Sequence, residues 1–164
     1  EQQDQVGQQV VVVERRVLGL RGETLVVSTP CGLLHTDAAG VGGLTSWFDL
    51  VVDTTSNNLL GPRGRAEGRP TVTAILATLA AAEHEALPAD RLYRQVWGAP
   101  EYHPLRNRNT LYVALGRVRN LLQQIGEARE VIRRVGDGWA LNPDVKVAIV
   151  RRDPRVSTVI IAPR

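Results

Sequence analysis

Four sequence patterns follow one another between residues 87 and 141, and their order constrains the fold more than any other feature of the chain. A short helix pattern ends at Trp97-Gly98. A longer helix pattern follows over Leu105–Leu122, and residues 104–120 hold four arginines and no acidic residue. An apolar strand, Val131–Val135, then leads through a Gly-x-Gly turn to Trp139. The region therefore predicts a helix, a loop, a basic helix and a β-hairpin.

The long helix pattern has two faces of different chemistry. Leu111, Leu115 and Val118 recur at helical spacing and predict a buried stripe, whereas the arginines fall largely off it. A helix with one apolar and one cationic face fits the major groove of DNA. These parts, in this order, are those of a winged helix-turn-helix. We expect an α+β fold with three helices, a leading antiparallel sheet, a C-terminal β-wing and a β-rich N-terminal extension.

The charge of the chain is distributed unevenly. Its net charge is only +3, but residues 1–60 carry three arginines against seven acidic residues, so the basic excess lies in the second half. Arginine provides 19 of the 20 basic residues. This bias favours bidentate contacts to phosphate or guanine, although a GC-rich coding sequence gives the same bias.

The remaining sequence suggests three segments: an extension over 1–45, a winged-helix domain over 46–150 and a tail over 151–164. In the first part of the chain we expect a hairpin of Val10–Val13 with Thr24–Ser28, a short strand over 32–36, a strand over Trp47–Asp53 and a turn over Thr54–Asn58. A basic loop over Gly61–Pro70 should lead to a helix over Thr71–Ala82, capped by Thr71 or Thr73, and to a second helix from Pro88 to Trp97. After the wing we expect a strand over Val145–Val150 and an apolar run over Val156–Ile161.

From Trp47 to Leu141 the chain resembles the OmpR/PhoB-type winged-helix effector domain of bacterial transcription regulators. Three segments carry the resemblance: Leu92–Gly98, Asn109–Leu122 and Arg134–Trp139. They correspond to a second helix that ends in Val-Trp, a recognition helix, and a wing of the form Val-Arg-Gly-x-Gly-Tyr. The resemblance implies a DNA-binding domain whose third helix enters the major groove.

Two residues depart from the family pattern. Gly116 lies inside the expected recognition helix, where glycine costs roughly 1 kcal/mol relative to alanine. It indicates either a close approach at that point or a less rigid helix. Asp137 places a negative charge at the wing tip, which argues against insertion of the tip into a minor groove.

The candidate DNA-binding residues lie on the exposed face of the basic helix and on the wing: Arg106, Arg108, Asn109, Thr110, Tyr112, Val113, Gly116, Arg117, Asn120, Arg133 and Arg134. A solvated basic face is the alternative interpretation. Strand alternation allows at most one of Arg133 and Arg134 to face DNA. Arg119 often has a structural role in the resembling family, and we expect Trp97 and Trp139 in the core.

No pattern for enzyme chemistry is found. The single Cys31 and His35 lack the further ligands of a zinc site, and no phosphate loop, dinucleotide fingerprint or Gly-x-Ser-x-Gly is present. We therefore expect no catalytic activity, no cofactor and no metal. The absence of an apolar span or signal peptide predicts a cytoplasmic protein without membrane contact. The absence of methionine indicates a chain that does not start at its natural start codon.

The primary hypothesis is sequence-specific DNA binding in bacterial transcriptional regulation, through a recognition helix over about 105–122. Expected partners are double-stranded DNA, RNA polymerase or another regulator through the 99–106 loop, and a second copy of the chain. The alternative is a winged-helix module for protein–protein interaction. It would gain support if Glu101, Glu127, Glu130 and Asp137 gathered beside the arginines.

Overall fold

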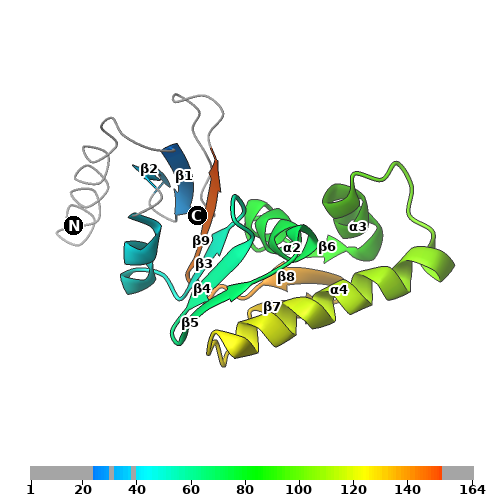
Figure 1. The fold of residues 1–164 in the computed structure, drawn as a ribbon. Coiled ribbons are helices and arrows are strands. Elements are labelled where there is room, and N and C mark those ends of the chain that lie inside the picture. Colours follow the sequence, from blue (N-terminus) through cyan, green and yellow to red (C-terminus); the bar gives the residue numbers. More distant parts are fainter. Residues whose placement is uncertain (1–23, 30–31, 38–39, 153–164) are drawn as a thin grey trace.

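The structure is a computed structural model that describes residues 24–29, 32–37 and 40–152 (Figure 1). Nine strands are found in these residues: β1 (Thr24–Thr29), β2 (Gly32–Asp37), β3 (Leu50–Asp53), β4 (Asn58–Gly61), β5 (Gly64–Glu67), β6 (Leu87–Pro88), β7 (Ile132–Val135), β8 (Gly138–Leu141) and β9 (Val147–Arg152). The helices are the 3-10 helix η1 (Gly40–Ser46) and the α-helices α2 (Pro70–Ala81), α3 (Ala89–Trp97) and α4 (Pro104–Gln124). The fold is α+β, as predicted.

A six-stranded sheet with the order β2-β1-β9-β3-β4-β5 forms the larger layer. The strand expected at 24–28 is present as β1, whereas the other strand of the predicted hairpin lies outside the described residues. β1 pairs with β2 on one side and with β9 on the other, so both of its edges are occupied. Val10–Val13, Cys31 and the apolar run over Val156–Ile161 lie outside the described residues.

The sheet is mixed, because β9 pairs in parallel with β3 and antiparallel with β1. β9 corresponds to the strand expected over 145–150, and its place between β1 and β3 ties the strands before residue 45 to those of the following domain. The division of the chain at residue 45 stays a prediction.

The two faces of this sheet are buried by different elements. Leu50 and Val52 of β3 pack with α2 in the main core, and Val51 between them packs with η1 in a second cluster. This alternation is the period of two that a strand imposes on its side chains. The strand begins later than predicted, because residues 40–46 form η1 and Trp47 lies in the turn after it with 52% of its surface exposed.

The prediction of a basic loop over Gly61–Pro70 is wrong for residues 64–67, which form β5 and pair with β4 as an edge strand. An edge strand tolerates arginine and glutamate because one of its edges faces solvent. The hairpin is attached to the end of α4, since Arg63 N–H donates to Ile125 O at 2.9 Å.

The three predicted helices are present with shifted ends. Arg69 occupies the N-cap position of α2 without a side-chain cap bond, so neither Thr71 nor Thr73 caps it. The Thr73 hydroxyl instead contacts Asn57 Oδ1 at 2.9 Å and Pro70 O at 3.1 Å. α3 ends as predicted at Gly98, which is left-handed with φ 61°. α4 starts at Pro104, inside the predicted loop, because proline is well suited to the first helical position.

The second sheet has the order β6-β8-β7 and contains the predicted wing. Trp139 of β8 is 2% exposed and belongs to the main core, as predicted. Gly138 lies against the backbone of β6, where a Cβ atom would be 2.7 Å from Leu87 O. A glycine is therefore required at this point of the wing.

A charged cluster joins the larger sheet to the turn after α4. Arg129 Nε donates to Glu127 Oε1 at 2.8 Å, and Arg129 Nη2 lies 3.0 Å from Asp49 Oδ1. The Glu127 side chain is only 3% exposed, so Arg129 supplies the charge that balances a buried carboxylate. Burial opposes ionisation of Asp49, but its bonds with Arg129 and the Lys146 N–H outweigh this effect and lower the pKa of Asp49. The hydrogen bond from Arg129 lowers the pKa of Glu127.

No helix among the described residues has both the length and the apolar character needed to cross a bilayer.

Candidate nucleic-acid interface

α4 is the element around which the candidate interface is built. Its predicted stripe is buried, with Leu111, Leu115 and Val118 at most 1% exposed. Figure 1 shows α4 running beside the β7–β8 hairpin, with α3 near its first turns and the β4–β5 hairpin near its last. One long face of α4 is therefore fixed by packing, and the opposite face is presented to solvent.

The start of α4 is held against α3 by polar and aromatic contacts. Asn107 Nδ2 donates to Tyr93 OH at 2.9 Å, and its Oδ1 accepts from His103 N–H at 2.8 Å. The Tyr93 ring stacks on Trp97 with centroids 4.6 Å apart. Trp97 is only partly buried at the margin of the core. These contacts fix the angle between the two helices.

The structure brings the candidate residues of α4 together on its exposed side. Seven of them are exposed: Arg106, Arg108, Asn109, Thr110, Val113, Arg117 and Asn120. Tyr112 and Gly116 are half-buried, and Arg119, for which we expected a structural role, is exposed. Leu105 was not singled out by sequence, yet it is 91% exposed beside Arg106. In the sequence, the position of Leu105 outside the buried stripe already indicated that it would be exposed.

The wing is attached to α4 through Tyr112. The Tyr112 ring meets Trp139 edge-on at 5.6 Å, and its hydroxyl accepts from Arg134 Nη1 at 3.2 Å. The Arg108 guanidinium lies over the Tyr112 ring at 5.5 Å, and that of Arg134 lies over Trp139 at the same distance. Hydrogen bonding to Arg108, together with the charge and hydrogen bond of Arg134, lowers the pKa of Tyr112. Two cations thus lie together at the junction of helix and wing.

Arg133 and Arg134 point to opposite faces of the wing, as strand alternation predicts. Arg134 is exposed beside α4. Arg133 is half-buried, and its Nε atom has no hydrogen-bond partner within the described chain. Of the two arginines, Arg134 is therefore the one positioned beside the basic helix.

The turn of the wing, residues 135–137, contains no basic residue. Val135 is 44% exposed, Asp137 is exposed, and Gly136 between them is left-handed with φ 61°. The turn offers an apolar and an acidic side chain, and Arg134 lies beside it, with its Nε donating to Gly136 O at 3.4 Å.

The four acidic residues that the sequence analysis named as a test of the alternative do not gather on this face. Glu127 is buried against Arg129, and Glu130 lines a hollow with Arg119 near the end of α4. Glu101 lies in the loop before α4 and Asp137 at the wing tip. Within residues 40–151, no ion pair engages Arg106, Arg108 or Arg117.

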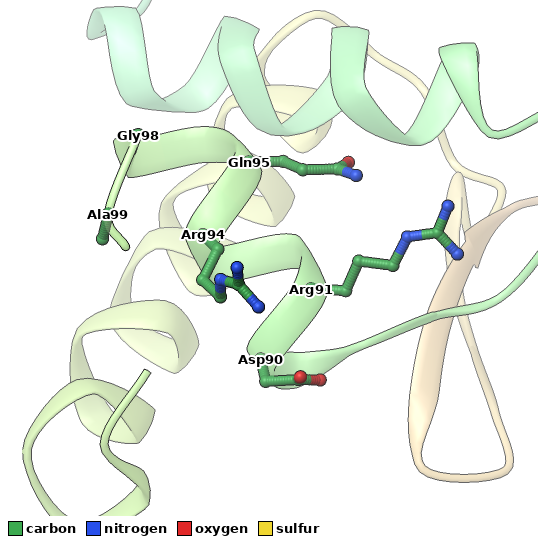
Figure 2. A pocket seen from close by; sticks show the side chains of 6 residues that line it. All are labelled: Asp90, Arg91, Arg94, Gln95, Gly98 and Ala99. Atoms are coloured by element: carbon green, nitrogen blue, oxygen red, sulfur yellow. The ribbon is translucent and has the colours of Figure 1, made fainter. Parts of the chain in front are cut away.

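A separate hollow on α3 has mixed charge. Figure 2 shows Arg91 and Gln95 extending to the same side of the helix, with Asp90 at its start. Arg91 Nη1 lies 3.2 Å from Glu85 Oε1, so part of its charge is compensated. Within the described part of the chain, no group of three or more His, Cys, Asp or Glu side chains is arranged to hold a metal ion.

Helices α3 and α4 with the β7–β8 hairpin form a winged helix-turn-helix. Residues 64–140 match the family model described as "Transcriptional regulatory protein, C terminal". This segment is a divergent domain of the OmpR/PhoB type, a family of DNA-binding regulatory domains and not a class of enzymes.

Comparison of folds finds the DNA-binding domain of CadC from E. coli, with a TM-score of 0.48 and 15% sequence identity. The alignment covers 74% of this chain and 94% of that one. No curated protein matches the sequence.

Replacing Gly116 by alanine should stabilise the domain. A Cβ atom at this position would meet no atom within 4 Å, so the glycine accommodates no close contact inside the chain. Alanine should raise the free energy of unfolding by about 0.5–1 kcal/mol, because it reduces the backbone entropy lost on helix formation. Urea denaturation measures the effect. An unchanged or lower stability would show that the helix requires glycine here for another reason.

Proposed function

We propose that this chain binds specific DNA sequences in bacterial transcriptional regulation, with α4 inserted into the major groove. The observation that carries the proposal is the exposed face of α4, which presents arginines and short polar side chains without an acidic residue. Such side chains form hydrogen bonds with base edges and phosphates. The family of residues 64–140 supports the same conclusion.

The roles of the candidate residues follow from their positions. Asn109 and Val113 lie near the middle of the exposed face, where an amide and an apolar side chain suit adenine and a thymine methyl group. Arg106, Arg108 and Arg117 border them and suit guanine or phosphate. Thr110, Tyr112, Gly116 and Asn120 complete the surface, and contacts from α3 and the wing would fix the register.

Arg134 is the wing residue that we assign to DNA, because it is exposed beside α4. Arg133 takes no part in the proposal. The apolar Val135 and the acidic Asp137 make a contact through Arg134 more favourable than insertion of the tip itself.

Further partners belong to the same proposal. The loop that precedes α4 exposes Glu101 and His103 and offers a contact for RNA polymerase or another regulator. β2 is the outermost strand of the larger sheet among the described residues, and it lies at the opposite edge from β5. Pairing of two copies of the chain along the β2 edge would leave α4 free for DNA. The site of action would be the bacterial cytoplasm, where the chromosome lies.

Binding to random-sequence duplex DNA tests the proposal. Fluorescence polarisation across a salt series should give a steep fall in affinity, because cations on the protein release counterions from phosphates. The double variant Arg108→Ala/Arg117→Ala should reduce the slope of log affinity against log salt by about 1.8 and weaken binding on the order of tenfold. Weak binding that neither salt nor the substitutions change would overturn the proposal and direct attention to a protein partner.

A further inference from the structure

The exposed face of α4 is bordered by the wing on one side and by the junction of β5 with α2 on the other. Tyr112 contacts the wing, whereas Arg117 lines a hollow with Arg69, Asn120 and Gln124. Tyr112 and Arg117 are five residues apart, which separates them by roughly 140° around a helix of 3.6 residues per turn. The wing and the β5–α2 junction therefore lie on different flanks of α4.

A helix in the major groove meets phosphates along both flanks. With side chains an α-helix is about 10–12 Å wide, and the groove is about 12 Å wide, so the two sugar-phosphate strands lie close to the helix on either side. The wing flank holds Arg108 and Arg134. A second group of cations on the other flank would hold the opposite strand.

We propose that Arg69, together with Arg117, forms a second phosphate-binding surface on the flank of α4 opposite the wing. The inference rests on the proposed function and extends its footprint to the N-terminus of α2, which the sequence analysis assigned to a loop. Arg69 is exposed, and its side chain makes no cap bond to α2. Among the described residues, neither Arg69 nor Arg117 takes part in an ion pair.

Packing holds Arg69 close to α4. The preceding Gly68 approaches the helix so closely that a Cβ atom on it would be 3.2 Å from Leu121 Cδ1. Gly68 N–H donates to Asn57 O at 2.8 Å, which fixes the backbone just before α2. The position of Arg69 beside Arg117 is therefore set by the core and requires no rearrangement of the chain.

Glu67 also lines this hollow, but strand alternation places its side chain on the face of Arg65, away from α4. Arg65 provides a matched control. It pairs in register with Leu60, which packs on the η1 cluster, whereas Ala66 packs on the main core. Arg65 is thus an exposed arginine on the opposite face of the sheet from α4.

Affinity for a random-sequence duplex, measured across a salt series, tests the inference. We expect steep salt dependence for the unmodified protein. Arg69→Gln should reduce the slope of log affinity against log salt by about 0.9 and weaken binding several-fold near 0.1 M salt. Arg65→Gln should leave the slope unchanged. Thermal melting checks that both variants are folded.

The outcomes separate this inference from the proposed function. A steep slope that Arg69→Gln leaves unchanged overturns the second surface and leaves DNA binding by α4 intact. Equal losses for Arg69→Gln and Arg65→Gln also overturn it, because they would indicate attraction by the general charge of the protein. A flat salt dependence of the unmodified protein overturns both proposals.

Discussion

Replacing Val113 by glutamate should abolish DNA binding and leave the domain folded. Val113 is 45% exposed on the outer face of α4, so a glutamate there can remain solvated in the free protein. In the complex it would be placed among phosphates and base edges, where a like charge costs several kcal/mol. We expect affinity to fall by a factor on the order of 100 or more, measured by fluorescence polarisation.

Ser46→Glu is the control for the added charge. Ser46 is exposed at the end of η1, which covers the other face of the larger sheet. The Ser46→Glu substitution changes the net charge by the same amount as Val113→Glu and should alter the affinity for DNA only slightly. If both variants bound DNA as the unmodified protein does, α4 could not be the element that enters the groove.

Replacing Arg129 by alanine should cause a large loss of stability. The substitution leaves the Glu127 carboxylate, 3% exposed, without its cation, and it also removes the contact with Asp49. Breaking a fully buried ion pair costs about 3–5 kcal/mol. The Arg129 side chain is 43% exposed, so solvent screening reduces the effect, and we expect a loss of about 2 kcal/mol near neutral pH.

The loss should depend on pH in a defined direction. The pKa values of Glu127 and Asp49 are lowered in the folded protein. The unfolded chain therefore binds more protons near the ordinary values of about 4, and unfolding becomes easier as pH falls. The stabilisation is complete above about pH 5 and is lost as pH falls through the lowered pKa values. The difference in free energy of unfolding between Arg129→Ala and the unmodified protein should therefore become smaller as pH falls.

Urea denaturation near pH 7 and near pH 3 measures this difference. Arg91→Ala is the matched control, because the side chains of Arg91 and Glu85 are 52% and 64% exposed. An exposed pair contributes about 0–1 kcal/mol, so this variant should be nearly neutral. An Arg129→Ala loss of the same size at both pH values would contradict the role given to the two carboxylates.

The candidate interface was largely predictable because its signals are local. The spacing of Leu111, Leu115 and Val118 determines which face of α4 is buried, and the remaining residues of the helix must then be exposed. Gly98 and the Gly136–Gly138 turn mark the end of α3 and the bend of the wing. Strand alternation likewise separated Arg133 from Arg134.

The sheet was less predictable because its partners are distant in sequence. The pairing of β9 with β1 and β3 depends on contacts between segments that no local pattern connects. β5 carries arginine and glutamate, and only its bonds to β4 make it a strand. Arg129 was not singled out, since its significance arises from the folded positions of Glu127 and Asp49.

Local sequence patterns were enough to predict the α+β class, the helices and wing, and the cationic face of α4, because helix periodicity and turn residues act over a few neighbouring positions. The residues that border that face became known only from the folded chain. It placed Arg134 on one flank and Arg69 on the other, and it removed Glu127 from the surface by burying it against Arg129. These placements come from long-range pairing and core packing, which are properties of the whole folded chain.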